Sequence, residues 1–144
     1  EAENFLTVVV DSTPPDVTVN VGEPKYASDK LYVTSKTPYT ISASDNLSGV
    51  ASVEYGIDSG IWLKYADNAF IVEGEGAHSI GAMATDNVGN VKIETLSITV
   101  DDTPPATEIS FEGINRASGN EVLVSPGTSI YRSVTDNLSG VVAT

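Results

Sequence analysis

The sequence predicts an all-β chain built from antiparallel sheets, and three observations support this prediction. Apolar residues alternate with polar ones in many short runs, for example at Val17, Val19 and Val21, as expected for half-buried strands. Clusters of Gly, Asn, Asp, Ser and Pro separate these runs and favour turns. No segment shows the period of about 3.6 residues that is typical of an amphipathic helix.

The chain also repeats itself. Residues 10–15 (VDSTPP) return as residues 100–105 (VDDTPP), and residues 45–50 (DNLSGV) return unchanged as residues 136–141. The two offsets are 90 and 91 residues, so one inserted residue reconciles them. Two matched segments at nearly the same interval indicate tandem modules of about ninety residues.

The phase of the repeat predicts the domain boundaries. Residues 6–11 (LTVVVD) match residues 96–101 (LSITVD). We therefore expect residues 1–11 to be the last strand of a preceding module, residues 12–102 to form a complete module, and residues 103–144 to be the first part of a following module. A chain that starts and stops in mid-repeat is expected to be a fragment of a longer array.

Seven strands are expected in the complete module. Residues 31–35 are expected to continue the first of them; the alternative is an extra strand, which would reverse the direction of all later strands. Seven short strands in about ninety residues match the size and spacing of an immunoglobulin-like antiparallel β-sandwich. The expected strands lie near residues 17–21, 39–43, 50–55, 62–65, 70–72, 78–84 and 93–100.

Composition excludes several classes of function. The chain carries 7 Lys and Arg against 20 Asp and Glu, a formal net charge of −13, and no Cys. A net negative charge of this size repels nucleic acid and anionic lipid. The lack of thiols excludes disulfides, thiol catalysis and thiolate metal sites. The longest apolar runs, such as residues 8–10, are too short to span a bilayer, so we expect no membrane insertion by this segment.

Aspartates in the loops are candidate Ca²⁺ ligands. In an antiparallel module of seven strands, the N-terminal linker and the loops after the second and sixth strands share one end, which groups Asp11 with Asp45 and Asp86. The same rule groups Asp101 and Asp102 with Asp136 at the start of the following module. Carboxylates from several loops suit Ca²⁺, which would stiffen the linker between modules. Alternatively, these aspartates form Asx turns and bind only their own loop backbone.

His78 and the aromatic residues each have two interpretations. His78 is the only histidine, so a Ser-His-Asp triad would have to use it, but its place in a strand favours a packed side chain that bonds to neighbouring backbone. Trp62 and Tyr65 could form a platform that stacks on sugar rings. The alternative is that both cover the core, since a module of this size needs large apolar side chains.

With these residues in view, the chain resembles the bacterial and archaeal immunoglobulin-like tandem repeats of surface proteins. The resemblance covers almost the whole chain and rests on the paired VDxTPP segments, on residues 44–50 (SDNLSGV), 75–80 (EGAHSI) and 84–90 (ATDNVGN), and on Trp62. Arg132 departs from the pattern, because it aligns with Ile41 on the expected inner face. The resemblance implies rigid spacer modules of adhesins, surface-layer proteins and multidomain hydrolases.

These observations lead to one expected function and one alternative. We expect a non-catalytic structural or adhesive spacer of an exported cell-surface or extracellular protein, with neighbouring modules of the same chain as its first partners and a surface protein or glycan as a further one. Calcium is the only cofactor that these residues indicate, at the linkers between modules. The alternative is a carbohydrate-binding accessory module of a secreted hydrolase.

Overall fold

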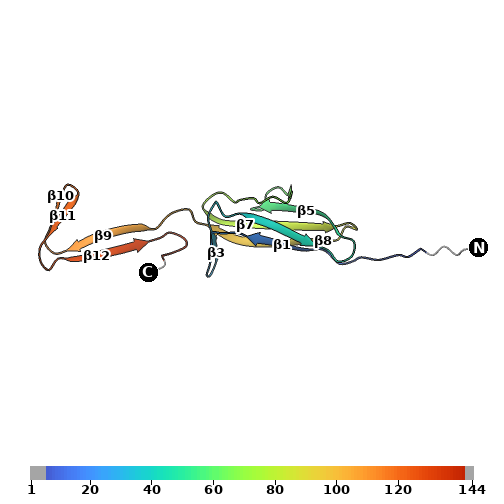
Figure 1. The fold of residues 1–144 in the computed structure, drawn as a ribbon, viewed down its shortest axis with the longest axis horizontal. Helices are drawn as coiled ribbons and strands as arrows, with labels where there is room; N and C mark the ends of the chain where they lie inside the picture. Colours follow the sequence, from blue (N-terminus) through green and yellow to red (C-terminus); the bar gives the residue numbers. More distant parts are fainter. Residues whose placement is uncertain (1–5, 142–144) are drawn as a thin grey trace, which may run out of the picture. The chain divides into compact units, whose positions relative to one another are not determined.

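The computed structural model describes residues 6–141, and these residues form strands and loops without a helix. The prediction of an all-β chain is therefore confirmed for the described residues. The chain divides into two compact units, residues 1–101 (unit 1) and residues 102–144 (unit 2), each of which is described here by itself (Figure 1). The ends of the predicted modules at residues 1–5 and 142–144 lie outside the described residues.

Unit 1 consists of two sheets. In the smaller sheet, β1 (Asp16–Val21) pairs antiparallel with β4 (Tyr39–Ser44), and an isolated bridge joins Tyr39 to Phe70. The larger sheet has the order β2-β3-β8-β7-β5-β6. Its strands are β2 (Lys25–Ala27), β3 (Leu31–Val33), β5 (Val50–Ile57), β6 (Leu63–Lys64), β7 (Gly76–Asp86) and β8 (Val91–Val100).

The core of unit 1 lies between the two sheets. Alternation along β7 buries Ile80, Ala82 and Ala84 completely, because every second side chain of a strand points to the same face. Ile80 packs in one buried cluster with Tyr39 and Val100. Ala82 and Ala84 belong to a second buried cluster, which contains Val17, Ile41 and Tyr65. Apolar side chains from both sheets thus meet in one layer, as in a β-sandwich.

The prediction that residues 31–35 continue the first strand is wrong. Residues 31–33 form β3, which makes a hairpin with β2 and also pairs in parallel with β8, with Tyr32 opposite Thr99 and Val33 opposite Val100. One extra strand would have reversed the direction of every later strand. Because β2 and β3 are inserted as a pair, the later directions are those expected from the sequence.

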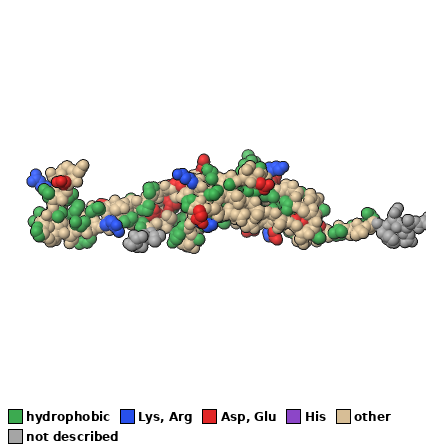
Figure 2. Space-filling view, in the orientation of Figure 1, with side chains coloured by type: hydrophobic (Ala, Val, Ile, Leu, Met, Phe, Trp, Pro, Cys, Tyr) green, Lys and Arg blue, Asp and Glu red, His purple; other side chains and the backbone are tan. Residues whose placement is uncertain are grey.

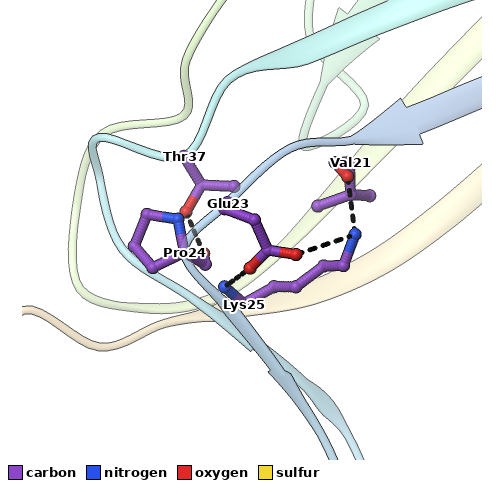
Figure 3. Close-up of polar contacts among 5 residues, drawn as sticks. All are labelled: Val21, Glu23, Pro24, Lys25 and Thr37. Atoms are coloured by element: carbon purple, nitrogen blue, oxygen red, sulfur yellow. Dashed lines mark hydrogen bonds and ion pairs between the residues drawn. The ribbon is translucent and has the colours of Figure 1, made fainter.

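Side-chain hydrogen bonds fix the point where the chain leaves β1 for this hairpin (Figure 3). The Lys25 ammonium donates to the Val21 carbonyl oxygen at 2.9 Å, and the Lys25 amide donates to Glu23 Oε2 at 3.0 Å. The fully buried Thr37 donates its hydroxyl to the Pro24 carbonyl oxygen at 2.6 Å. These bonds tie the start of the hairpin to the segment that precedes β4.

Unit 2 contains two antiparallel pairs, and its pairing follows that of β1–β4. β9 (Ala106–Glu112) pairs with β12 (Ser129–Thr135), and Ala106 lies opposite Thr135 as Asp16 lies opposite Ser44. β10 (Asn115–Ser118) and β11 (Glu121–Val124) form a hairpin at the place of β2 and β3. The Thr128 hydroxyl donates to the Ile114 carbonyl oxygen at 3.0 Å, at the position that Thr37 and Pro24 occupy in unit 1.

The two units differ in burial. None of the described residues of unit 2, 102–141, is buried. Its apolar side chains are instead exposed, and some of them are visible on the face of unit 2 in Figure 2. The exposed ones are Ile109, Ile114, Val122, Leu123, Val124, Ile130, Tyr131 and Val141.

Candidate metal centre

Three aspartates meet at one end of unit 1. Asp11 precedes β1, Asp45 follows β4 and Asp86 ends β7. Each offers a carboxylate oxygen, and these three oxygens all lie within 4.8 Å of one another. The structure therefore brings together three of the six aspartates that the sequence predicts as ligands.

The strand pairing explains why these three residues converge. Asp16 at the start of β1 lies opposite Ser44 at the end of β4, so the segments that carry Asp11 and Asp45 adjoin. In the larger sheet Val50 pairs with Asp86, which brings the end of β7 to the start of β5 and hence to the loop after Asp45. Residues far apart in the sequence thus share one end because the strands between them are antiparallel.

Each aspartate also binds loop backbone. Asp45 Oδ2 accepts hydrogen bonds from the amides of Leu47 at 3.0 Å and Gly49 at 2.8 Å. Asp86 Oδ1 accepts from the amides of Val88 at 3.0 Å and Asn90 at 2.8 Å. The Asx-turn interpretation is therefore correct for these two loops, and it fixes the carboxylates in place.

Asp11 differs because it also joins two loops. Its Oδ1 accepts from the amide of Thr13 at 3.1 Å, and its Oδ2 accepts from the amide of Ser48 at 3.0 Å, in the loop after β4. The Asp11 carboxylate therefore connects the linker by a hydrogen bond to the loop that also carries Asp45.

Two asparagines, which sequence reasoning treated only as turn residues, tie the three segments together. The Asn87 amide nitrogen donates to the carbonyl oxygens of Ser48 at 2.7 Å and Gly49 at 3.0 Å. The Asn90 amide nitrogen donates to Asp86 Oδ2 at 2.7 Å and to the Asp11 carbonyl oxygen at 3.3 Å. Both residues belong to the segment ATDNVGN. This motif indicated a turn at these positions, but it did not indicate which groups the two asparagines bind.

The electrostatics of the cluster favour ionised carboxylates. The Ser48 hydroxyl lies close to the Asp11 carboxylate, although not in the geometry of a hydrogen bond, and with the amide of Thr13 it holds the pKa of Asp11 below its ordinary value. Burial acts to raise the pKa of Asp86, but hydrogen bonds from Asn90, Val88 and Gly89 together outweigh it and lower that pKa. Side-chain ion pairs in the described part of the chain involve Glu23, Asp58 and Asp16 rather than these three aspartates. The cluster thus concentrates negative charge that these ion pairs do not neutralise.

Two polar atoms at the cluster lack partners. Asp45 Oδ1 and Ser48 Oγ are buried and make no hydrogen bond among the residues that the structure describes. Buried oxygens without a donor are costly. An oxygen-binding cation would satisfy both atoms.

The donor set fits a hard cation. Ca²⁺ binds oxygen at about 2.3–2.6 Å, so two ligands of one ion are at most roughly 5 Å apart, and the three carboxylate oxygens all lie within 4.8 Å of one another. The second oxygens, the Ser48 hydroxyl and water can raise the number of ligands toward the six to eight that Ca²⁺ prefers.

The other three predicted ligands lie elsewhere. Asp101 follows β8, at the end of unit 1 opposite to Asp86, and its amide donates to the Val33 carbonyl oxygen at 2.8 Å. Asp102 and Asp136 belong to unit 2. Asp136 Oδ1 accepts from the amides of Leu138 at 3.1 Å and Gly140 at 2.7 Å, which repeats the turn of Asp45. The one group of three metal-ligating side chains that the described residues form is that of Asp11, Asp45 and Asp86.

His78 is bonded on both sides of its ring. Nδ1 lies 2.6 Å from Asp58 Oδ2, and Nε2 lies 2.9 Å from the Gly74 carbonyl oxygen. The bond to backbone agrees with the structural interpretation of this residue. In a Ser-His-Asp arrangement the second ring nitrogen faces the serine hydroxyl, and here a carbonyl oxygen occupies that position.

Trp62 and Tyr65 do not form a flat exposed pair. Tyr65 is buried in the core, whereas Trp62 is 40% exposed. The indole lies over Gly81, where a Cβ would be 3.0 Å from Cη2. Gly81 pairs with Gly56 and alternates with the buried Ile80 and Ala82, so Trp62 covers the outer face of the larger sheet. The expectation that both aromatic residues cover the core holds for Tyr65 and is wrong for Trp62.

Comparison of the chain with family models, with curated proteins and with solved structures finds no match. Among the described residues there is no helix with the length and apolar character needed to cross a membrane.

Proposed function

We propose that this chain is a non-catalytic structural module, and that Ca²⁺ binds at the end of unit 1 where the linker enters. The observation that carries the proposal is the meeting of Asp11, Asp45 and Asp86 within 4.8 Å. A cation there joins the linker residue Asp11 to two loops of the sandwich, so binding would order the linker as well as the module.

The wider proposal is a spacer in a tandem array of immunoglobulin-like sandwiches in an exported surface or extracellular protein. It is supported by the repeated VDxTPP and DNLSGV segments and by the shared register of β1–β4 and β9–β12. The Thr-Pro-Pro linkers limit backbone freedom between modules, because proline fixes φ. The partners are then neighbouring modules first and a surface protein or glycan second.

Thermal unfolding of the 144-residue chain in Ca²⁺ and in chelator tests the cation site. We expect Ca²⁺ to raise the transition temperature of unit 1 in a saturable manner. The corresponding gain in the free energy of unfolding is about 2.7 kcal/mol when free Ca²⁺ is about 100 times its Kd. Asp45→Asn and Asp86→Asn each remove a ligand oxygen and are expected to abolish most of this shift.

Asp16→Asn is the matched control. Asp16 lies on the same end of the sheet, has an 85% exposed side chain and pairs with Lys92, so its loss removes one negative charge without touching the cluster. If Asp16→Asn reduces the calcium shift as much as Asp45→Asn does, the effect is general charge screening. If Ca²⁺ leaves the unfolding of the unaltered chain unchanged, the aspartates are turn residues only.

No specific observation favours the carbohydrate-binding alternative. Its main sequence support was a possible aromatic platform, and Tyr65 is only 9% exposed. A single indole over two glycines offers one stacking surface rather than a pair.

A further inference from the structure

The larger sheet of unit 1 has an open edge along most of β8. On one side β8 pairs with β7 over its whole length. On the other side it pairs with β3 only at Thr99 and Val100, and no other strand of the described residues joins it there. Residues 91–97 therefore form an edge that the fold of unit 1 itself creates. Val91 and Ile93 on this edge are 49% and 54% exposed.

The backbone groups of β8 point toward the open edge at every second residue. The Asp101 amide donates to the Val33 carbonyl oxygen at 2.8 Å, so the backbone of Asp101 faces β3 rather than β7. Alternate residues of a strand direct their amide and carbonyl groups to the same side, and the pairing of β8 with β7 contains no bulge. The amides and carbonyls of Val91, Ile93 and Thr95 hence face the open edge, where they are a template for a further strand.

β1 lies beside this edge but does not cover it. A groove of about 500 Å³ separates residues 16–19 of β1 from Lys92, Glu94 and Leu96 of β8. The Lys92 ammonium spans the groove and lies 3.1 Å from Asp16 Oδ1. The groove leaves room for the side chains of an added strand on the face of β8 that carries Lys92 and Glu94.

The side chains along the edge are complementary to those of a second copy. Lys92 and Glu94 are two residues apart and so share one face of β8. In two antiparallel copies of this edge that meet at Ile93, Lys92 of each copy lies opposite Glu94 of the other. The two exposed Ile93 side chains then face each other, and Val91 lies opposite Thr95. Cross-strand pairs of opposite charge stabilise an antiparallel ladder, and the apolar side chains lose contact with water.

The neighbouring registers of the same edge are less favourable. A shift by one residue would set outward backbone groups against inward ones and so remove the hydrogen bonds between the strands. A two-fold axis at Glu94 would place two carboxylates directly opposite each other, and an axis at Lys92 would oppose two ammonium groups, which is destabilising. An axis at Thr95 would place Glu94 opposite Leu96. Of these registers, the axis at Ile93 is the one that opposes unlike charges.

We propose that two copies of this chain associate through residues 91–95 of β8, antiparallel and about a two-fold axis at Ile93, so that the two larger sheets become one. The backbone groups of Ile93 bind those of Ile93 in the second copy, and the backbone groups of Val91 bind those of Thr95. A contact of this kind uses the same surface on both copies, so it closes on itself and gives a dimer rather than a filament. It uses unit 1 alone and does not depend on the cation site.

Mixing of two charge variants tests this register. Lys92→Glu chains carry two carboxylates on this face of the edge, and Glu94→Lys chains carry two ammonium groups, so each variant opposes like charges when it pairs with itself. A one-to-one mixture opposes unlike charges at every pair. Sedimentation velocity in chelator at about 0.15 M salt, which screens the repulsion between distant charges, is the measurement. We expect dimers for the unaltered chain, monomers for each variant alone, and dimers again for the mixture.

Lys64→Glu is the matched control, because it makes the same change of charge on β6, at the other edge of the larger sheet. The dimer should persist in this variant. A monomer at all concentrations for the unaltered chain would overturn the proposal, and Lys92 would then be a charge that keeps an edge strand unpaired. Dimers that form equally well in Lys92→Glu alone and in Glu94→Lys alone would overturn the register.

Disulfide formation gives a second test, because the chain contains no Cys. In the proposed register the two copies of residue 93 lie about 5.5 Å apart between Cα atoms, within the range of a disulfide. The two copies of residue 91 are separated by four residues, or about 13 Å along the strand. Ile93→Cys chains should therefore form disulfide-linked dimers under a mild oxidant several-fold faster than Val91→Cys chains. Both side chains are about half exposed, so neither change removes a core contact, and equal rates would contradict the axis at Ile93.

Discussion

At the scale of single residues, His78 has an environment that favours its protonated form. Asp58 Oδ2 and the Gly74 carbonyl oxygen face its two ring nitrogens, and both oxygens are acceptors. Only the imidazolium donates from both nitrogens. The hydrogen bond to Asp58 is the largest cause of the raised pKa of His78, and the Gly74 carbonyl adds to it.

This environment predicts a pH dependence of stability. A group whose folded pKa is raised contributes stability that is complete below its unfolded pKa, here 6.5, and that is lost as pH rises through the folded pKa. Urea unfolding of the chain should therefore show a decrease in stability from about pH 6.5 upward. His78→Gln should remove this decrease, since His78 is the only histidine. An unchanged pH profile in His78→Gln would contradict the assignment.

The residue scale also shows what sequence reasoning can and cannot reach. Strand parity alone was enough to place Asp11, Asp45 and Asp86 at one end. The pair Asp58 and His78 was not predicted, because the two residues meet only through the register of β5 and β7, in which Ile57 lies opposite Ile80. A shift of one residue would have turned the Asp58 side chain to the other face.

At the scale of elements, the contact between β5, β7 and Trp62 depends on two glycines. Gly56 and Gly81 lie opposite each other, and the indole rests where their side chains would stand. A Cβ at Gly81 would be 3.0 Å from Trp62 Cη2, whereas a Cβ at Gly56 would be 3.7 Å from its nearest neighbour. The position of the Trp62 indole therefore depends on the absence of a side chain at Gly81.

We expect Gly81→Ala to displace the indole from the sheet. The emission of Trp62, the only tryptophan, should shift to longer wavelength, and stability should fall by about 1–2 kcal/mol because of the tight contact. Gly56→Ala is the matched control, since its methyl group meets only ordinary contacts. An identical emission spectrum for both variants would show that Trp62 does not depend on Gly81.

Elements of low sequence periodicity were the ones that sequence reasoning missed. β2 and β3 have 3 residues each, too few to display an alternating pattern. The position of β3 also depends on parallel pairing with β8 across more than sixty residues, and a local sequence window carries no information on such pairing. Longer strands such as β7, with 11 residues, could be predicted because alternation continues through them.

At the scale of the whole molecule, burial is confined to unit 1 in the part of the chain that the structure describes. Ile80, Ala82 and Ala84 are fully buried there, whereas residues 102–141 contain no buried position. Since apolar burial is the main favourable term in folding, the two units should differ strongly in local stability.

Hydrogen exchange in dilute solution measures this difference. Amides in the paired strands β7 and β8 should exchange slowly, through opening that requires unfolding of unit 1. Amides of β9 and β12 should exchange much faster, although the two strands are paired, because no layer of side chains covers them. Similar protection in both units would mean that unit 2 is stabilised by contacts other than burial within the single chain.

The opposite placement of Asp11 and Asp101 in unit 1 has a mechanical consequence. Asp11 joins the module beside Asp86, and Asp101 leaves it beyond Val100, at the far end of β7 and β8. A tensile load between these residues acts along the strands, so the hydrogen bonds between β3 and β8 are sheared together rather than opened one at a time. Unit 1 therefore has the geometry of an element that transmits pull along its length.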